Sequence, residues 1–100
     1  MDKGEIIIET AQLLEKDLAL PVPKGNMDRD GLIKYLEPLI HQLLNRDFEK
    51  LLQVCYRIDL GEEKLKEILH ESPPEQLSKD LSTAIVDRQI LKIQIRRKYQ

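Results

Sequence analysis

The chain has 100 residues, of which 41% are hydrophobic and 34% are charged, and its formal net charge is −2. This length limits it to one domain with a small core, and this composition excludes an intrinsically disordered chain. The charge is unevenly distributed. Residues 1–87 carry 11 basic and 18 acidic residues, a net charge of −7, whereas residues 88–100 carry five basic residues and no acid.

Three features of the sequence bear on the cellular compartment of the protein. Cys55 is the only cysteine, so no intramolecular disulfide is possible, and nothing indicates an oxidising compartment. The acidic start is not typical of a secretory signal, and no apolar stretch reaches the roughly 20 residues of a membrane span. We therefore expect a cytoplasmic protein.

The first predicted helix covers residues 2–19. Asp2 and Glu5 have the spacing of a capping box at a helix N-terminus. An apolar stripe follows at helical spacing, formed by Ile7, Ala11, Leu14 and Leu18. Ile8 lies off this stripe. Residues 21–27 contain two prolines and a Gly-Asn pair, which predict a connection between helices.

The second predicted helix starts near Asp28 or Asp30, either of which is a suitable cap. Its inward residues are Leu32, Leu36, Leu39 or Ile40, and Leu43. Pro38 lies inside this pattern and cannot donate a hydrogen bond to the Lys34 carbonyl, so we expect a kink there. A short corner then ends at Asp47, which is expected to cap the third helix.

The third and fourth helices follow without a long connection. The predicted inward residues of the third are Phe48, Leu51, Leu52 and Cys55, with Ile58 closing its end. Asp59 and Glu62 repeat the capping-box spacing and predict the start of the fourth helix. The fourth helix would then place Leu65, Ile68 and Leu69 inward.

Two helices joined by a short turn also have the span of a DNA-binding helix-turn-helix. The helix that would enter the major groove, residues 62–71, carries four acids against two lysines, with no Arg, Asn or Gln. Such a helix would repel the phosphates that it has to approach. The pair of helices is therefore interpreted as structural.

The last predicted helix starts at a third signal, with Ser72 as cap and Pro73 at the first helical position, followed by Glu75. Its apolar positions at helical spacing are Leu77, Leu81, Ala84, Ile85 and Leu91. Residues 91–95 alternate between apolar and polar, so a short terminal strand is the alternative to helix for this stretch.

Read as a helix, residues 85–95 are apolar around most of the circumference and require cover on several sides. A second subunit is the natural source of that cover. We therefore predict self-association, for instance as a homodimer, and the candidate interaction residues are Ile90, Ile93, Ile95 and Tyr99.

The basic end offers a second hypothesis, binding of nucleic acid or another polyanion. Its candidate residues are Arg88, Lys92, Arg96, Arg97 and Lys98. Only Tyr99 is available to stack on a base, and the segment lacks the clean apolar face of a membrane-surface helix. Pairing of these cations with the acidic body is the simpler interpretation, and Asp87 and Arg88 are expected to pair across to neighbouring helices.

No catalytic residue, metal site, cofactor site or small-molecule substrate is identified. His41, His70 and Cys55 fall on three different helices without the paired spacing of metal ligands. The carboxylates occupy caps and solvated faces, and Arg57 and Asp59 are expected to pair across the turn between the third and fourth helices. We expect a protein that is not an enzyme.

Residues 47–59 contain a Tyr-Arg-Ile-Asp turn, followed by Glu62-Glu63-Lys64-Leu65 and later by Arg88-Gln89. In these features the chain resembles a group of short uncharacterised bacterial proteins. The resemblance implies a bacterial, cytoplasmic, all-helical protein and brings no activity or functional residue with it.

These observations predict one all-α domain over residues 1–100, a small bundle of four or five helices with the second kinked at Pro38. The predicted function is a non-enzymatic protein–protein interaction or assembly module, and polyanion binding through residues 88–100 is the alternative.

Overall fold

The computed structural model describes residues 3–18 and 28–99, and over these residues the chain consists of helices joined by turns, without a strand. The prediction of an all-α bundle is confirmed. Its five helices are α1 (Lys3–Leu18), α2 (Arg29–Arg46), α3 (Phe48–Arg57), α4 (Glu62–Glu71) and α5 (Leu77–Lys98). The capping residue Asp2 and the connection 21–27 lie outside the described residues.

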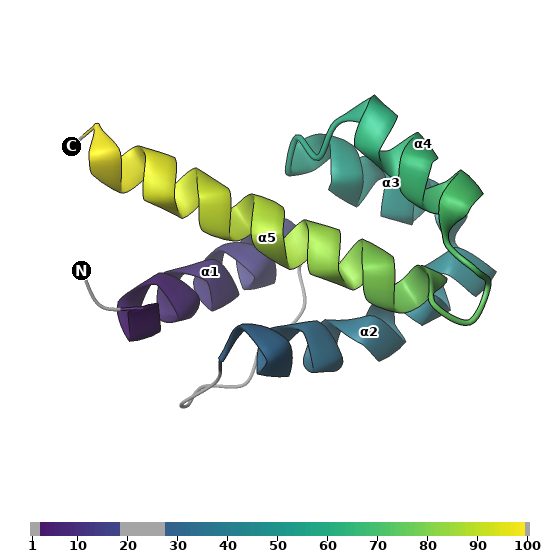
Figure 1. The fold of residues 1–100 in the computed structure, drawn as a ribbon, viewed down its shortest axis with the longest axis horizontal. Coiled ribbons are helices and arrows are strands. Elements are labelled where there is room, and N and C mark those ends of the chain that lie inside the picture. The colour runs from purple at the N-terminus through teal and green to yellow at the C-terminus, as the bar shows by residue number, and fades with distance from the viewer. Residues whose placement is uncertain (1–2, 19–27, 100) are drawn as a thin grey trace.

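Helix α5 is the longest element and organises the others. It contacts α2, α1 and α4, whereas α3 contacts α2 and α1. Figure 1 shows α3 and α4 beside the first half of α5, and α1 beside its second half. As a result α1 begins at the same end of the molecule at which α5 finishes.

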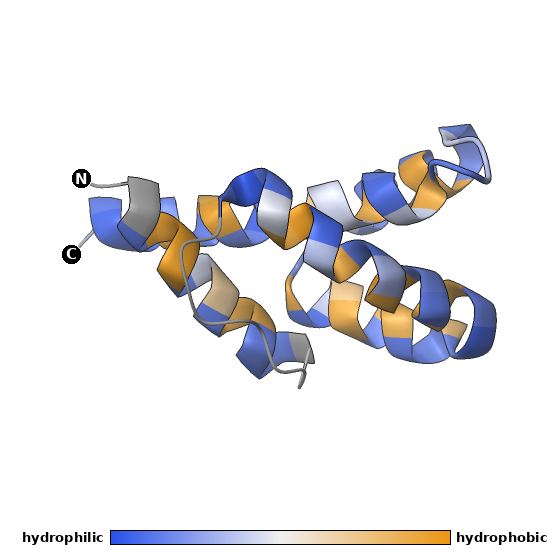
Figure 2. Ribbon diagram, turned by 90° about the horizontal axis from the view of Figure 1, so that it is seen from below, coloured by the Kyte–Doolittle hydropathy of each residue, from blue (hydrophilic) through white to orange (hydrophobic). Residues whose placement is uncertain are grey.

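The core lies where the five helices meet, and each helix contributes at least one buried apolar side chain. Figure 2 shows orange, hydrophobic segments beside blue ones on these helices, the pattern of amphipathic helices. The main cluster contains Leu14, Leu32, Ile33, Leu36, Ile40, Leu51, Val54, Cys55, Ile58, Leu65, Ile68, Leu81, Ile85 and Val86.

The N-terminal caps of α2 and α3 are the predicted ones. The Asp28 carboxylate caps α2 by accepting a hydrogen bond of 2.7 Å from the Gly31 N–H. Asp47 is the single residue between α2 and α3, and its carboxylate accepts from the Lys50 N–H at 3.1 Å. Pro38 lies within α2, and its kink stays a prediction.

Two residues of α3 differ from the predicted inward set. Val54 is buried, whereas the Phe48 side chain is 42% exposed. Phe48 lies on the predicted face, but it is the first residue of α3, at the corner where α2 ends, and the neighbouring helices do not cover it. The prediction of an inward Phe48 is therefore wrong.

The capping box predicted for α4 is also wrong. Asp59 has a φ of 60°, a left-handed conformation that ends α3, and the Leu60 N–H donates to the Cys55 carbonyl at 3.0 Å. Gly61, with a φ of 98°, is the N-cap of α4 and supplies no side chain. The Asp59 carboxylate pairs with Arg88 instead of Arg57, whose guanidinium donates to the Asp17 carbonyl.

Helix α5 starts at Leu77, four residues later than the position predicted for Pro73. A residue that precedes proline is disfavoured in the helical conformation, and Pro73 precedes Pro74. The chain forms a turn instead, in which the Gln76 N–H donates to the Pro73 carbonyl at 2.9 Å. Ser72 ends α4, and its hydroxyl donates to the Asp80 carboxylate at 2.6 Å.

Candidate interaction surface between α4 and α5

The end of α5 is helical through Lys98, so the alternative of a strand at 91–95 is excluded. Helix α1 covers more of this end than the sequence indicated. Ile93 is buried, and Ile90 is half-buried against the core. Of the four predicted interaction residues, only Ile95 (45% exposed) and Tyr99 (79% exposed) are open to a partner. Ile93 cannot contact one.

Polar contacts hold α1 against this part of α5. The Gln89 side chain is fully buried, and its amide nitrogen donates to the Asp17 carboxylate at 2.7 Å. The Arg97 guanidinium donates to Glu9 at 2.5 Å and 3.3 Å and also reaches Glu5. The hydrogen bond that Arg97 donates to Glu9 raises the pKa of Arg97 above its ordinary value.

The predicted polyanion-binding residues divide into two groups. Arg97 is ion-paired with α1, and Arg88 lies 3.4 Å from the Asp59 carboxylate. Lys92 is half-buried, whereas Arg96 and Lys98 are exposed. Asp87, which precedes Arg88 on α5, accepts two hydrogen bonds, of 2.6 Å and 2.8 Å, from the Arg29 guanidinium. The predicted pairing of Asp87 and Arg88 across to neighbouring elements is confirmed.

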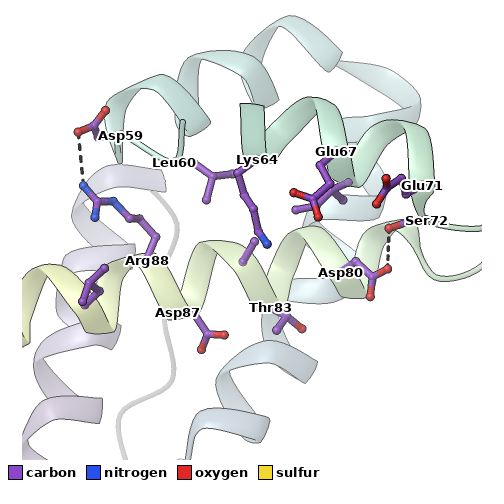
Figure 3. Close-up of a pocket in the computed structure, with 13 residues that line it drawn as sticks. Asp59, Leu60, Lys64, Glu67, Glu71, Ser72, Asp80, Thr83, Asp87 and Arg88 are labelled. Atoms are coloured by element: carbon purple, nitrogen blue, oxygen red, sulfur yellow. Dashed lines mark hydrogen bonds and ion pairs between the residues drawn. The ribbon is translucent and has the colours of Figure 1, made fainter. Parts of the chain in front are cut away.

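An open groove of about 820 Å³ runs between α4 and α5 (Figure 3). Its apolar lining consists of Leu60, Ile68, Ala84 and Leu91. Leu91 is 44% exposed, so the apolar lining is accessible from outside. The helices α4 and α5 approach each other because Ile68 packs into the core, while the turn 72–76 connects their ends.

The polar lining of the groove is predominantly acidic. Its charged residues are Asp59, Lys64, Glu67, Glu71, Asp80, Asp87 and Arg88, which gives five carboxylates against two cations. Figure 3 shows Glu67 and Glu71 on α4 facing the side of α5 that carries Thr83 and Asp80. An apolar floor between acidic walls fits an amphipathic helix with basic flanks.

The groove does not assemble catalytic groups. It has no His or Cys lining, and Ser72 and Asp59 are occupied with Asp80 and Arg88 respectively. Burial raises the pKa of the Cys55 thiol to about 11, far from a nucleophile's range. Within residues 3–18 and 28–99 no group of three or more His, Cys, Asp or Glu is arranged to hold a metal ion.

The two histidines lie apart from this groove. The His41 ring lies 3.2 Å from the Ser78 hydroxyl and 3.0 Å from the Asn45 amide, which accounts for both of its nitrogens. His70 is in the last turn of α4.

A second cleft, of about 710 Å³, lies between α1 and the end of α5, but its acids Glu5 and Glu9 already bind Arg97.

Sequence reasoning missed the groove. Ala84 and Leu91 are apolar positions at helical spacing in the last predicted helix, and such spacing does not indicate an open surface. The one available signal is the cluster of four acids within residues 62–71, which also argues against DNA binding.

The chain matches no protein-family model, and comparison with curated proteins and with solved structures finds no significant relative. The resemblance to short bacterial proteins stays a prediction. None of the described helices is both long enough and apolar enough to cross a membrane.

Proposed function

We propose that this chain is a non-enzymatic protein–protein interaction module that binds an amphipathic, basic helix in the groove between α4 and α5. The observation that carries the proposal is the exposed apolar lining around Leu91 between acidic walls. Burial of such a lining contributes about 25 cal/mol for each Å² of apolar surface removed from water.

Charge complementarity supports a basic partner. The groove carries three more carboxylates than cations, and complementary charge across an interface accelerates association and rejects partners of the wrong sign. The paired carboxylates, Asp59 and Asp87, are held by arginines of the same chain, whereas Glu67 and Glu71 stand on the exposed wall formed by α4.

Polyanion binding through the basic end is the alternative. It has less support because Arg88 and Arg97 already pair with acids of the same chain, which leaves Lys92, Arg96 and Lys98 for phosphates. Three cations would give a shallow dependence of affinity on salt concentration.

Two synthetic helical peptides test the proposal. Both are about 18 residues long, roughly five turns, with the same leucine stripe, and their polar positions are lysine in one and glutamate in the other. We expect the lysine peptide to shift the amide NMR signals of residues around Leu60, Ala84 and Leu91, and the glutamate peptide to leave them unchanged.

The variant Leu91→Glu should lower the affinity for the lysine peptide at least about tenfold, which corresponds to 1.4 kcal/mol. Its matched control is Ile8→Glu, which changes an apolar residue of similar exposure on α1 and should bind as the unmodified chain does. Equal binding of both peptides, or shifts elsewhere on the molecule, would contradict the proposal. Tight binding of single-stranded RNA at low salt would favour the alternative.

A further inference from the structure

We infer that the segment bound in the α4–α5 groove is the second half of α5 with its C-cap Tyr99, residues 87–99, from another copy of this chain, in a symmetric antiparallel dimer. The inference rests on the proposed function, because it names the partner of the same groove. In such a dimer each copy supplies one groove and one helix end, so both contacts are identical.

The apolar residues needed for this contact form one continuous stripe. Leu91 and Ile95 of α5 and Tyr99, the residue that caps its end, are spaced four residues apart, and all three are exposed. Leu91 lines the groove, whereas the part of α5 that follows it extends past α4 (Figure 1). With the two copies of Leu91 facing each other, Ile95 and Tyr99 of each copy would lie over the groove of the other.

Helix α1 leaves this stripe open. Ile93 is two residues from both Leu91 and Ile95, so it points to the opposite side of α5, at about 100° per residue. Ile93 is buried, and Arg97, one turn later on the same side, binds Glu9 of α1. The second half of α5 is thus fixed on one side by its own chain and presents a rigid apolar stripe on the other.

Charge determines the orientation of the two copies. Residues 88–98 carry five cations, of which Arg96 and Lys98 are exposed, and the groove carries five carboxylates against two cations. An antiparallel pair brings each basic end to an acidic groove, whereas a parallel pair would place two basic ends together. Like charges in contact oppose association, so the antiparallel arrangement is favoured.

A charge swap tests the inference by sedimentation equilibrium at about 100 µM protein and about 50 mM salt, where screening is weak. The end variant is Arg96→Glu with Lys98→Glu, and the groove variant is Glu67→Lys with Glu71→Lys. We expect the unmodified chain to dimerise and each variant alone to associate at least about tenfold more weakly, a difference of 1.4 kcal/mol.

A one-to-one mixture of the two variants should dimerise again, because each contact then joins groups of opposite charge. The control, Lys34→Glu with Lys50→Glu, reverses two exposed cations on α2 and α3 and should leave dimerisation unchanged. The uncharged pair Ile95→Gln and Ile8→Gln tests the stripe separately. Only Ile95→Gln should weaken association.

Several results would overturn the inference: a monomeric unmodified chain, an end variant that associates more tightly, or a mixture that stays monomeric although circular dichroism shows both variants helical. If the chain is monomeric but the lysine peptide still binds the groove, the proposed function stands with a different partner. If the chain is monomeric and the peptide does not bind, both fail.

Discussion

Both halves of α5 are held by apolar burial, and the second half has polar contacts to α1 in addition. In the first half, Leu81, Ile85 and Val86 are buried in the main apolar cluster. In the second half, Ile93 is buried and polar contacts to α1 add to this burial, since Gln89 binds Asp17 and Arg97 pairs with Glu9. Apolar burial is strong without being directional, whereas the polar contacts fix position at modest net stability.

This difference explains why the second half keeps an exposed apolar stripe. Helix α5 contacts α2, α1 and α4, and Figure 1 shows α4 beside its first half and α1 beside its second. A helix with apolar residues on two opposite sides then has one side without cover from its own chain. This uncovered apolar side of the second half is part of the proposed interaction surface.

Truncation of one buried isoleucine in each half gives the largest expected effect. Ile85→Ala should lower the free energy of unfolding of the whole domain by about 3 kcal/mol, because it opens a cavity in the main cluster. Ile93→Ala should mainly release α1. Hydrogen exchange would then show loss of protection throughout the domain in the first variant and loss concentrated in α1 in the second. Equal loss over all helices in both variants would show that the halves form one cooperative unit.

Alkaline pH should weaken the core around the first half. Burial raises the pKa of Cys55 from 9.0 to about 11, so folding favours the neutral thiol. The resulting stabilisation is present below pH 9.0 and is lost as the pH rises from 9.0 to 11, by about 2 kcal/mol. Urea unfolding at several pH values measures this loss. The Cys55→Ala variant is the control, and an equally steep loss there would exclude the thiol as its cause.

Loss of the buried polar contact should have a smaller effect, confined to the second half. Asp17→Ala removes the acceptor of Gln89, whose amide oxygen already has no hydrogen-bond partner. The cost should be about 1–2 kcal/mol, seen as faster hydrogen exchange in α1. Glu15→Ala changes an exposed carboxylate of the same helix and should have little effect. If both variants behave alike, the Gln89 contact does not hold α1.

Local sequence patterns predicted the helices well and their junctions less well. The spacing of apolar residues located all five helices, and the caps at Asp28 and Asp47 were correct because a capping side chain bonds within three residues. Asp59 and Ser72 had equally suitable neighbours but adopted other roles. Asp59 took a left-handed conformation and paired with Arg88, and Ser72 bonded to Asp80.

The candidate site shows the same limit. The sequence predicts Ile93, Ile95 and Tyr99 as interaction residues, but Ile93 is buried, because α1, more than 70 residues away in the chain, covers it. The groove itself joins α4, the turn before it and α5, and each contributes residues that are ordinary in their own segment.

The order of apolar and capping residues along this chain determined that it forms a small number of helices and where its charges lie, because these properties depend on neighbours within a turn or two. Only the tertiary structure decided which apolar faces are covered. That outcome depends on how helices distant in sequence pack around α5, and it left Leu91, Ile95 and Tyr99 exposed while it buried Gln89 and Ile93.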